Sequence, residues 1–142
     1  MAYTKQILDI QGSPMETLVF TPDSGDAAPG IVIAQHIPNS HISLEGDPFT
    51  IDIGERMAKA GYVCVIPYIF HWWPSDEDIA VKREGWRDDR CLADMRAAYD
   101  LVAGLDQVDA SRIGVLGHCW GGRVAWIEAA SNPGYKTSVV LY

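Results

Sequence analysis

Short hydrophobic runs recur along the chain and are separated by polar segments. Two of them, residues 30–35 and 62–67, are almost continuously apolar, which is typical of parallel strands covered on both faces. Between these runs, Asp47 and Pro48 precede apolar residues at four-residue spacing, and Gly61 follows them. Asp and Pro are favoured at helix starts and Gly just after helix ends, so the pattern predicts a strand, a helix and a second strand.

The remaining segments continue this alternation. A leading pair of strands is expected to turn at Gly12-Ser13-Pro14, and residues 22–29 are expected to form a surface loop. The other predicted elements are strands 7–10 and 16–20, a helix over 88–104, a strand over 112–116, a helix over 122–130 and a strand over 137–142. Alternating strands and helices predict an α/β fold with a mostly parallel sheet. No linker or repeat divides the sequence, so residues 1–142 are expected to form one domain.

Composition limits the partners and the location. The 142 residues are 48% hydrophobic, enough for one compact core, and the net charge of −8 argues against nucleic acid or an anionic membrane as partner. No apolar run reaches the roughly 18–20 residues that cross a bilayer, and no cleavable leader pattern is seen, so a cytoplasmic location is expected. The three cysteines form no C-x-x-C pair, and no phosphate loop is present. We therefore predict no disulfide framework, no metal site and no cofactor.

The segment Gly117-His118-Cys119-Trp120-Gly121-Gly122 lies where a predicted strand turns into a predicted helix. A residue on so sharp a turn needs neighbours without bulk, which the glycines supply, so the pattern predicts a nucleophile elbow with Cys119 as nucleophile. A helix N-terminus favours a thiolate and typically lowers a cysteine pKa from about 8.5 to roughly 3.5–7.5. The alternative is a tight structural turn around an inert thiol. Cys64 and Cys91 are interpreted as structural.

Through this elbow motif the chain resembles the dienelactone hydrolases of the α/β-hydrolase superfamily. Members of that family carry a cysteine in a G-x-C-x-G-G motif. Residues 29–37 resemble the third strand of that family with its following loop, and residues 61–67 resemble the fourth. The resemblance implies cleavage of a small ester or lactone through a thioester, with the backbone N–H groups of Ile37 and Trp120 forming an oxyanion hole. It covers about the N-terminal three-fifths of a family member. The catalytic aspartate and histidine of the family lie further on, so we expect this sequence to be a piece of a longer protein.

His36 departs from the family, which typically has a glutamate there that contacts the resting thiol. Two interpretations stay open. In one, His36 takes the proton of Cys119 and forms a thiolate–imidazolium pair, which a histidine pKa near 6.5 allows. In the other, it lines the pocket. His118 adjoins the nucleophile and is expected to point away from the site, and His41 is assigned no role.

Further candidates come from the strand ends, which meet at one edge of a parallel sheet. His71, Trp72 and Trp73 follow the strand at 62–67 and are expected to form an aromatic wall of the substrate site.

The resemblance also implies an arginine partner, which Arg83 matches, with Arg87 and Arg90 as alternatives. A guanidinium would suit an anionic carboxylate on the substrate. Arg123 follows the elbow, where cations are unfavourable, so a side chain that reaches toward the pocket mouth would explain it.

Two functions of other classes also stay open. An apolar edge strand invites pairing, so a non-catalytic domain could act through a complementing chain or as a homodimer joined by its last strand. An accessible Cys119 could instead be oxidised in a redox-responsive protein, although no resolving cysteine is evident. The partner favoured by the sequence is a small ester or lactone, and its turnover separates the three readings.

Overall fold

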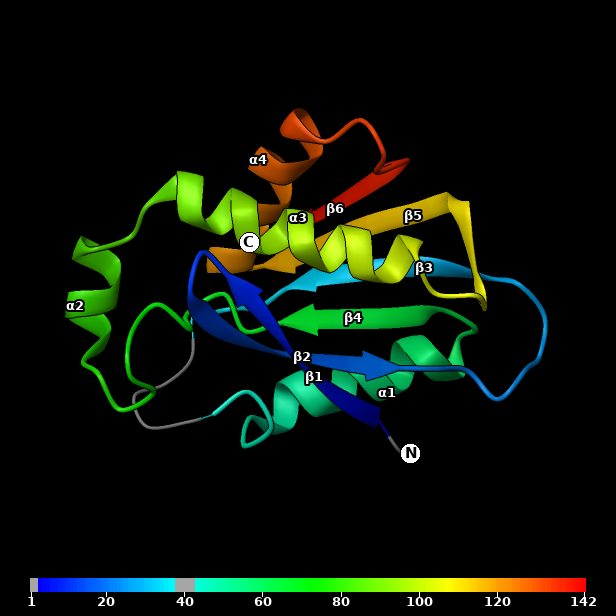
Figure 1. Ribbon diagram of the computed structural model, residues 1–142, viewed down its shortest axis with the longest axis horizontal. Helices are drawn as coiled ribbons and strands as arrows, with labels where there is room; N and C mark the ends of the chain where they lie inside the picture. The colour runs from blue at the N-terminus through cyan, green and yellow to red at the C-terminus, as the bar shows by residue number, and fades with distance from the viewer. Residues whose placement is uncertain (1–2, 38–42) are drawn as a thin grey trace.

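A computed structural model describes residues 3–37 and 43–142, so His41 lies outside the described residues. A six-stranded sheet with the strand order β1-β2-β4-β3-β5-β6 forms the centre of the molecule (Figure 1). β1 and β2 are antiparallel, β2 is also antiparallel to β4, and the β3–β4, β3–β5 and β5–β6 pairs are parallel. The strands are β1 (Tyr3–Ile10), β2 (Ser13–Phe20), β3 (Ala28–Ala34), β4 (Val63–Pro67), β5 (Val108–His118) and β6 (Thr137–Leu141).

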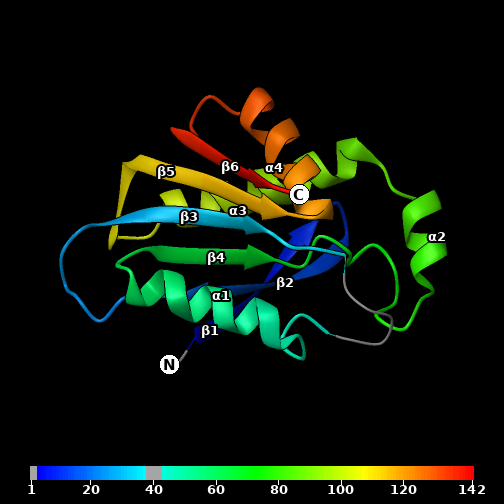
Figure 2. The same cartoon turned by 180° about the vertical axis from the view of Figure 1, so that it is seen from behind.

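Helices cover both faces of this sheet. α3 (Asp88–Ala103) and α4 (Trp120–Ser131) pack on one face, and α1 (Pro48–Lys59) packs on the other, against β2 and β4 (Figures 1 and 2). The short α2 (Ile79–Glu84) lies beyond the edge where β3, β4 and β5 end. The predicted α/β fold with a mostly parallel sheet is confirmed.

Burial follows the pattern that the sequence predicts for parallel strands. All five residues of β4 are buried, and β3 is buried along almost its whole length. One hydrophobic core contains almost fully buried apolar side chains from β2, β3, β4 and α3. It forms because both faces of the central strands are covered. The core members with the least exposure include Phe20, Leu18, Ile33, Ile66 and Met95.

The ends of α1 are set by the residues that the sequence singles out. The Asp47 carboxylate accepts a hydrogen bond from the Phe49 N–H, and Pro48 occupies the first helical position. Gly61 follows the helix with a φ of +97°, a left-handed conformation that favours glycine. These three predictions are confirmed.

One local prediction is wrong, and one helix was not predicted. The hairpin turns at Gln11 and Gly12, which have φ values of 54° and 88°, whereas Ser13 and Pro14 belong to β2. Two successive positive φ values match the twist of a two-residue hairpin, and a Gly at the second position permits it. The sequence also misses α2, whose six residues are too few to show a helical period.

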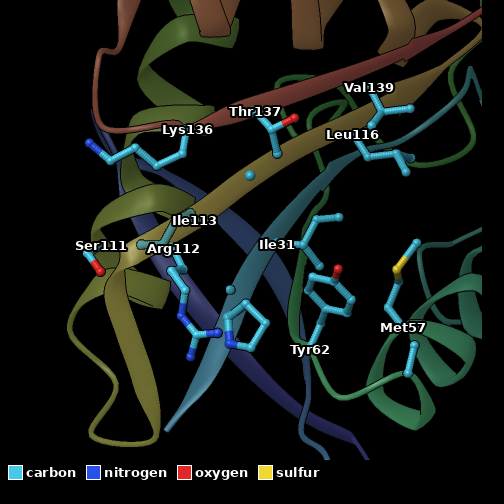
Figure 3. A pocket seen from close by; sticks show the side chains of 14 residues that line it. Ile31, Met57, Tyr62, Ser111, Arg112, Ile113, Leu116, Lys136, Thr137 and Val139 are labelled. Carbon is cyan, nitrogen blue, oxygen red and sulfur yellow. The ribbon is translucent and has the colours of Figure 1, made fainter.

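β6 is an edge strand, and all five of its residues are exposed. Beside it, on the face that carries α1, the sheet is hollowed by a cavity of about 650 Å³ (Figure 3). Ile31, Leu116 and Val139 line it from three neighbouring strands, and Met57 and Tyr62 line it from the other side. Cys119 is not among its lining residues.

None of the helices in the described part of the chain is long and apolar enough to span a membrane. The cytoplasmic location and the single-domain organisation stay predictions.

Candidate active site

Cys119 stands at the turn between β5 and α4, after His118 and before Trp120. Its φ of 56° and ψ of −126° lie outside the regions that L-residues normally populate. Such a conformation costs of the order of 1–3 kcal/mol and persists where the surroundings impose it, often at functional sites. Cys119 is exposed to solvent. The predicted strand, elbow and helix are therefore present in that order, with the thiol accessible.

The three glycines of the elbow each lack room for a side chain. A Cβ on Gly117 would collide with the carbonyl of Gly121, and a Cβ on Gly121 would collide with the carbonyl of Ala34. A Cβ on Gly122 would lie 2.6 Å from the Leu141 carbonyl oxygen. The expectation that this turn has no room for side chains is confirmed. A side chain at any of the three positions would collide with backbone atoms, which cannot move aside as a flexible side chain can.

Backbone hydrogen bonds fix the elbow to the neighbouring strand. The N–H of Cys119 donates to the carbonyl of Leu141 in β6 at 3.0 Å, and the N–H of Gly122 donates to the Cys119 carbonyl at 2.9 Å. Cys119 is thus held from β6 and from the first turn of α4.

The other two cysteines are buried, as expected. Burial raises the pKa of the Cys64 thiol in β4 and of the Cys91 thiol in α3. Neither offers a reactive thiolate, so Cys119 is the accessible thiol of the chain.

The two predicted oxyanion donors flank the elbow. Trp120 is the first residue of α4, where backbone N–H groups have no partner within the helix. Ile37 is half-buried and follows β3. A Cβ on Gly121 would also lie 2.6 Å from the Gln35 carbonyl, so the elbow packs directly against the end of that segment. The role of both N–H groups stays a prediction.

His36 lies in a small polar cluster beside the elbow. Its Nε2 is 3.1 Å from Oδ2 of Asp47, and its ring stacks on that of His118 with centroids 5.6 Å apart. Both ring nitrogens of His118 are buried without a hydrogen-bond partner. Burial, and secondarily the charge of His36, lowers the pKa of His118. The His118 ring therefore packs against His36. The sequence analysis expected His118 to point away from the site, but it lies next to this candidate site residue.

Comparison with known proteins identifies the chain. Residues 15–142 match the Dienelactone hydrolase family. The chain belongs to this family. A Salmonella typhimurium protein named "Putative carboxymethylenebutenolidase" is 32% identical over 140 residues, which are 93% of this chain and 49% of that protein. A protein of the same name from Methylorubrum extorquens is 28% identical over 131 residues, 85% of this chain and 42% of its own length.

A solved structure agrees with the sequence match. The crystal structure titled "Putative Dienelactone Hydrolase from Klebsiella pneumoniae subsp. pneumoniae" has a TM-score of 0.78 and 25% identity, and the match covers 99% of this chain and 60% of that one. The fold is therefore that of the dienelactone hydrolases, an α/β-hydrolase fold. The chain spans about half of the length of the relatives that it matches by sequence.

Within this dienelactone hydrolase fold, His71 is held by hydrogen bonds to two other elements, and its predicted place in a substrate wall stays a prediction. Its side chain is only 2% exposed, with Nε2 2.7 Å from Oδ1 of Asp94 and Nδ1 2.8 Å from Oγ of Ser13. Trp72 donates from Nε1 to Oδ2 of Asp94 at 3.0 Å. Burial raises the pKa of Asp94, and its hydrogen bonds to His71 and Trp72 oppose that rise. The ring ties the loop after β4 to α3 and β2, a role that sequence spacing could not reveal.

The two tryptophans of this loop are half-buried. The Arg90 guanidinium lies over the Trp72 ring, 4.7 Å from the centroid. Trp73 packs against Gly85 and lines a cavity of about 420 Å³ together with Tyr68 and His71. Substrate contact by either tryptophan stays a prediction.

Trp86 is a residue that the sequence analysis missed. Its ring lies edge-on to Trp120, with centroids 5.3 Å apart, and 5.3 Å from that of Phe70. It thereby connects the loop after β4 to the residue that follows Cys119. A tryptophan directly after Gly85 and just before α3 was the available signal.

The candidate arginines occupy different settings. Arg83 is exposed on α2. Arg123 forms two hydrogen bonds to the Asp88 carboxylate, at 2.6 and 2.9 Å, and this pairing lowers the pKa of Asp88. The ion pair explains a cation in the first turn of α4 without a substrate. Arg87 pairs in the same way with Asp89.

Within residues 3–37 and 43–142, no group of three or more His, Cys, Asp or Glu side chains is placed to hold a metal ion. The expected independence from metals and cofactors stays a prediction.

Gly121→Ala should destabilise the protein, because its Cβ meets the Ala34 backbone rather than a flexible side chain. We expect a loss of at least about 1–3 kcal/mol in the free energy of unfolding, measured by urea denaturation. Gly25→Ala is the control, since a Cβ there meets nothing within 4 Å, and it should change stability by less than about 0.5 kcal/mol. Equal effects would contradict the packing account of the elbow.

His71→Ala leaves the buried Asp94 carboxyl without its main partner. The expected cost is about 3–5 kcal/mol in the free energy of unfolding. Ser13→Ala removes the hydroxyl that contacts Nδ1 and the backbone carbonyl of His71 but leaves the His71–Asp94 contact, and it should cost about 0.5–1.5 kcal/mol. Urea denaturation of both variants tests the assignment, which fails if His71→Ala is no more costly than Ser13→Ala.

Proposed function

We propose that this chain carries the nucleophile of a cysteine-dependent hydrolase that cleaves a small ester or lactone. The observation that supports it most directly is the exposed thiol of Cys119 on an elbow whose backbone conformation is enforced by three glycines. Membership of the Dienelactone hydrolase family, and relatives named carboxymethylenebutenolidase, support the ester or lactone class.

In the proposed reaction, the Cys119 thiolate attacks the carbonyl carbon of the substrate. An S–C bond forms and the carbonyl electrons move to oxygen, where the N–H groups of Ile37 and Trp120 stabilise the developing charge. One such donor is worth about 2.7–4 kcal/mol in comparable sites. The C–O bond then breaks, the alcohol leaves with a proton, and a thioester remains until water hydrolyses it.

The proton of Cys119 needs an acceptor, and His36 is the proposed one within this chain. It lies beside the elbow and is 24% exposed, with Nε2 3.1 Å from Oδ2 of Asp47. Trp72, Trp73 and Arg83 remain proposed substrate contacts. His71 and Arg123 are left out of this proposal, because Ser13, Asp94 and Asp88 already bind them.

Hydrolysis of p-nitrophenyl acetate and of a small lactone tests the proposal. Cys119→Ala should lower the rate at least about 100-fold, because the nucleophile is removed. Cys91→Ala, which removes a buried thiol, is the matched control and should retain activity. A chain extended with the part of the Klebsiella relative that this chain does not match, about 40% of that protein, is tested in parallel.

Each outcome places the catalytic groups in a different part of the protein. Turnover by the 142-residue chain that depends on Cys119 supports a base among these residues. Turnover by the extended chain alone assigns the remaining catalytic groups to the other half. Equal turnover by Cys119→Ala in both settings would refute Cys119 as the nucleophile.

A second candidate function is self-association through β6. Its support is the combination of an edge strand with every residue exposed and the cavity of about 650 Å³ beside it. Unpaired N–H and C=O groups on such an edge can pair with a second copy of the chain.

Sedimentation equilibrium tests this second candidate. If β6 pairs, the mass should rise with concentration, and Val139→Lys should weaken the dimer by roughly tenfold or more, because a charge on an edge strand opposes pairing. Ile7→Lys on β1, the opposite edge, is the control, since Ile7 is exposed there. A monomer at all concentrations, or equal effects of the two variants, would exclude pairing through β6.

A further inference from the structure

The cavity of about 420 Å³ lies between the β1–β2 hairpin and the loop after β4, and Cys119 is not among its described lining residues. Ile7 and Glu16 are directly opposite each other in the hairpin, so their side chains lie on the same face of the sheet. Both line the cavity, and Tyr68 and Trp73 line it from the loop. The N–H of Tyr68 donates to the backbone carbonyl of Glu16 at 2.8 Å, which joins the two walls. The volume lies within the range of about 300–1,000 Å³ that is usual for small-molecule sites.

The charge that faces this cavity is negative. Its described lining residues include one carboxylate, that of Glu16, and no lysine or arginine. The side chain of Glu16 is 38% exposed, and the Nζ of Lys5 lies 3.6 Å from it. The same Nζ lies 2.7 Å from Glu45, so the closer ion pair of Lys5 is with Glu45. His71 also lines the cavity, but other elements bind both of its ring nitrogens. Glu16 is therefore the ionic group available to a ligand.

One cation lies behind the wall, and acidic neighbours outnumber it. The Lys82 ammonium donates to the backbone carbonyl of Ser75, a lining residue, at 3.2 Å. Lys82 itself is only 1% exposed. Burial lowers the pKa of Lys82, and the charges of Glu77 and Asp76 oppose that shift. The two carboxylates more than balance one ammonium, so this side of the cavity does not favour an anion.

Aromatic side chains supply much of the remaining wall. Trp73 is half-buried, and Tyr68 is 7% exposed. The Tyr68 hydroxyl is buried without a hydrogen-bond partner among the described residues. Burial raises the pKa of Tyr68, and the charge of Glu16 raises it further, so the hydroxyl stays neutral beside this carboxylate. The cavity thus combines two electron-rich rings with one carboxylate.

We propose that this cavity is a binding site for a small organic cation, such as a quaternary ammonium group. The faces of tryptophan and tyrosine rings attract cations, and a carboxylate supplies the opposite charge. An anionic ligand would meet Glu16 and a chain with a net charge of −8. The proposal goes beyond the hydrolase function and does not depend on Cys119.

The position of Lys5 gives the proposal a prediction with two signs. Loss of the Glu16 charge should weaken the binding of a cation, because its counter-charge is removed. Loss of the Lys5 charge should strengthen it, because the ammonium 3.6 Å from Glu16 no longer competes with the ligand. A purely hydrophobic cavity would respond to neither change.

The test uses choline as the probe and 3,3-dimethylbutan-1-ol, which has the same shape without the charge, as the matched control ligand. Their dissociation constants are measured at low ionic strength by titration of the saturation-transfer difference NMR signal of the ligand methyl protons. The protein variants are Glu16→Gln, Lys5→Gln and Trp73→Leu. Asp23→Asn is the control variant, because it removes one exposed negative charge that does not line this cavity.

Choline should bind the wild-type chain at least about tenfold more tightly than its uncharged analogue. Glu16→Gln and Trp73→Leu should each weaken choline binding by roughly fivefold or more, and Lys5→Gln should tighten it by roughly twofold or more. Asp23→Asn should leave it unchanged.

The proposal is overturned if choline gives no signal or binds no better than the alcohol. It is also overturned if Glu16→Gln binds choline as the wild type does, or if Asp23→Asn weakens binding as much as Glu16→Gln. Glu16 is partly exposed, so its variant tests the site even if Trp73→Leu does not fold. No ester is turned over in these titrations, so their outcome is independent of the hydrolase proposal.

Discussion

The contact between the glycines of the elbow and the backbone around them is the constraint on which the site depends. Gly121 sits so close to the Ala34 and Gln35 carbonyls that no side chain fits, and Gly122 approaches the carbonyl of Leu141 in the same manner. These approaches draw the start of α4 against the ends of β3 and β6. Cys119 is left outside the packing, in a backbone conformation that the surrounding strands impose.

The same close approach determines which groups surround the thiol. Because the elbow abuts the end of β3, His36 and Ile37 come next to it, and the start of α1 brings Asp47 to His36. On the other side, Trp120 contacts Trp86, through which the loop after β4 reaches the elbow. The chemistry proposed for Cys119 therefore draws on several strand ends, as is usual where a parallel sheet carries a site at the carboxyl ends of its strands.

The sequence predicted correctly those features in which a local steric or capping requirement is met by one type of residue. The elbow glycines, the Asp47 cap and the left-handed Gly61 each follow from sterics or capping, and the buried strands follow from continuous apolar runs. It failed where partners are distant along the chain. The position of His71 after β4 did not reveal that Asp94 and Ser13, 23 and 58 residues away, bind both of its ring nitrogens. The contact of Asp47 with His36 was hidden in the same way, since a cap pattern says nothing about what lies beyond the helix.

The central claim is that the Cys119 sulfur forms a covalent bond with the acyl group of an ester. Mass spectrometry of the intact protein, quenched in acid shortly after mixing with p-nitrophenyl acetate and followed by peptide mapping, tests it most directly. The account predicts one acetyl group on the peptide that contains Cys119, absent from Cys119→Ala and removed from the wild type by hydroxylamine at neutral pH, as expected of a thioester. An acetyl group on another residue, or equal labelling of Cys119→Ala, would contradict it.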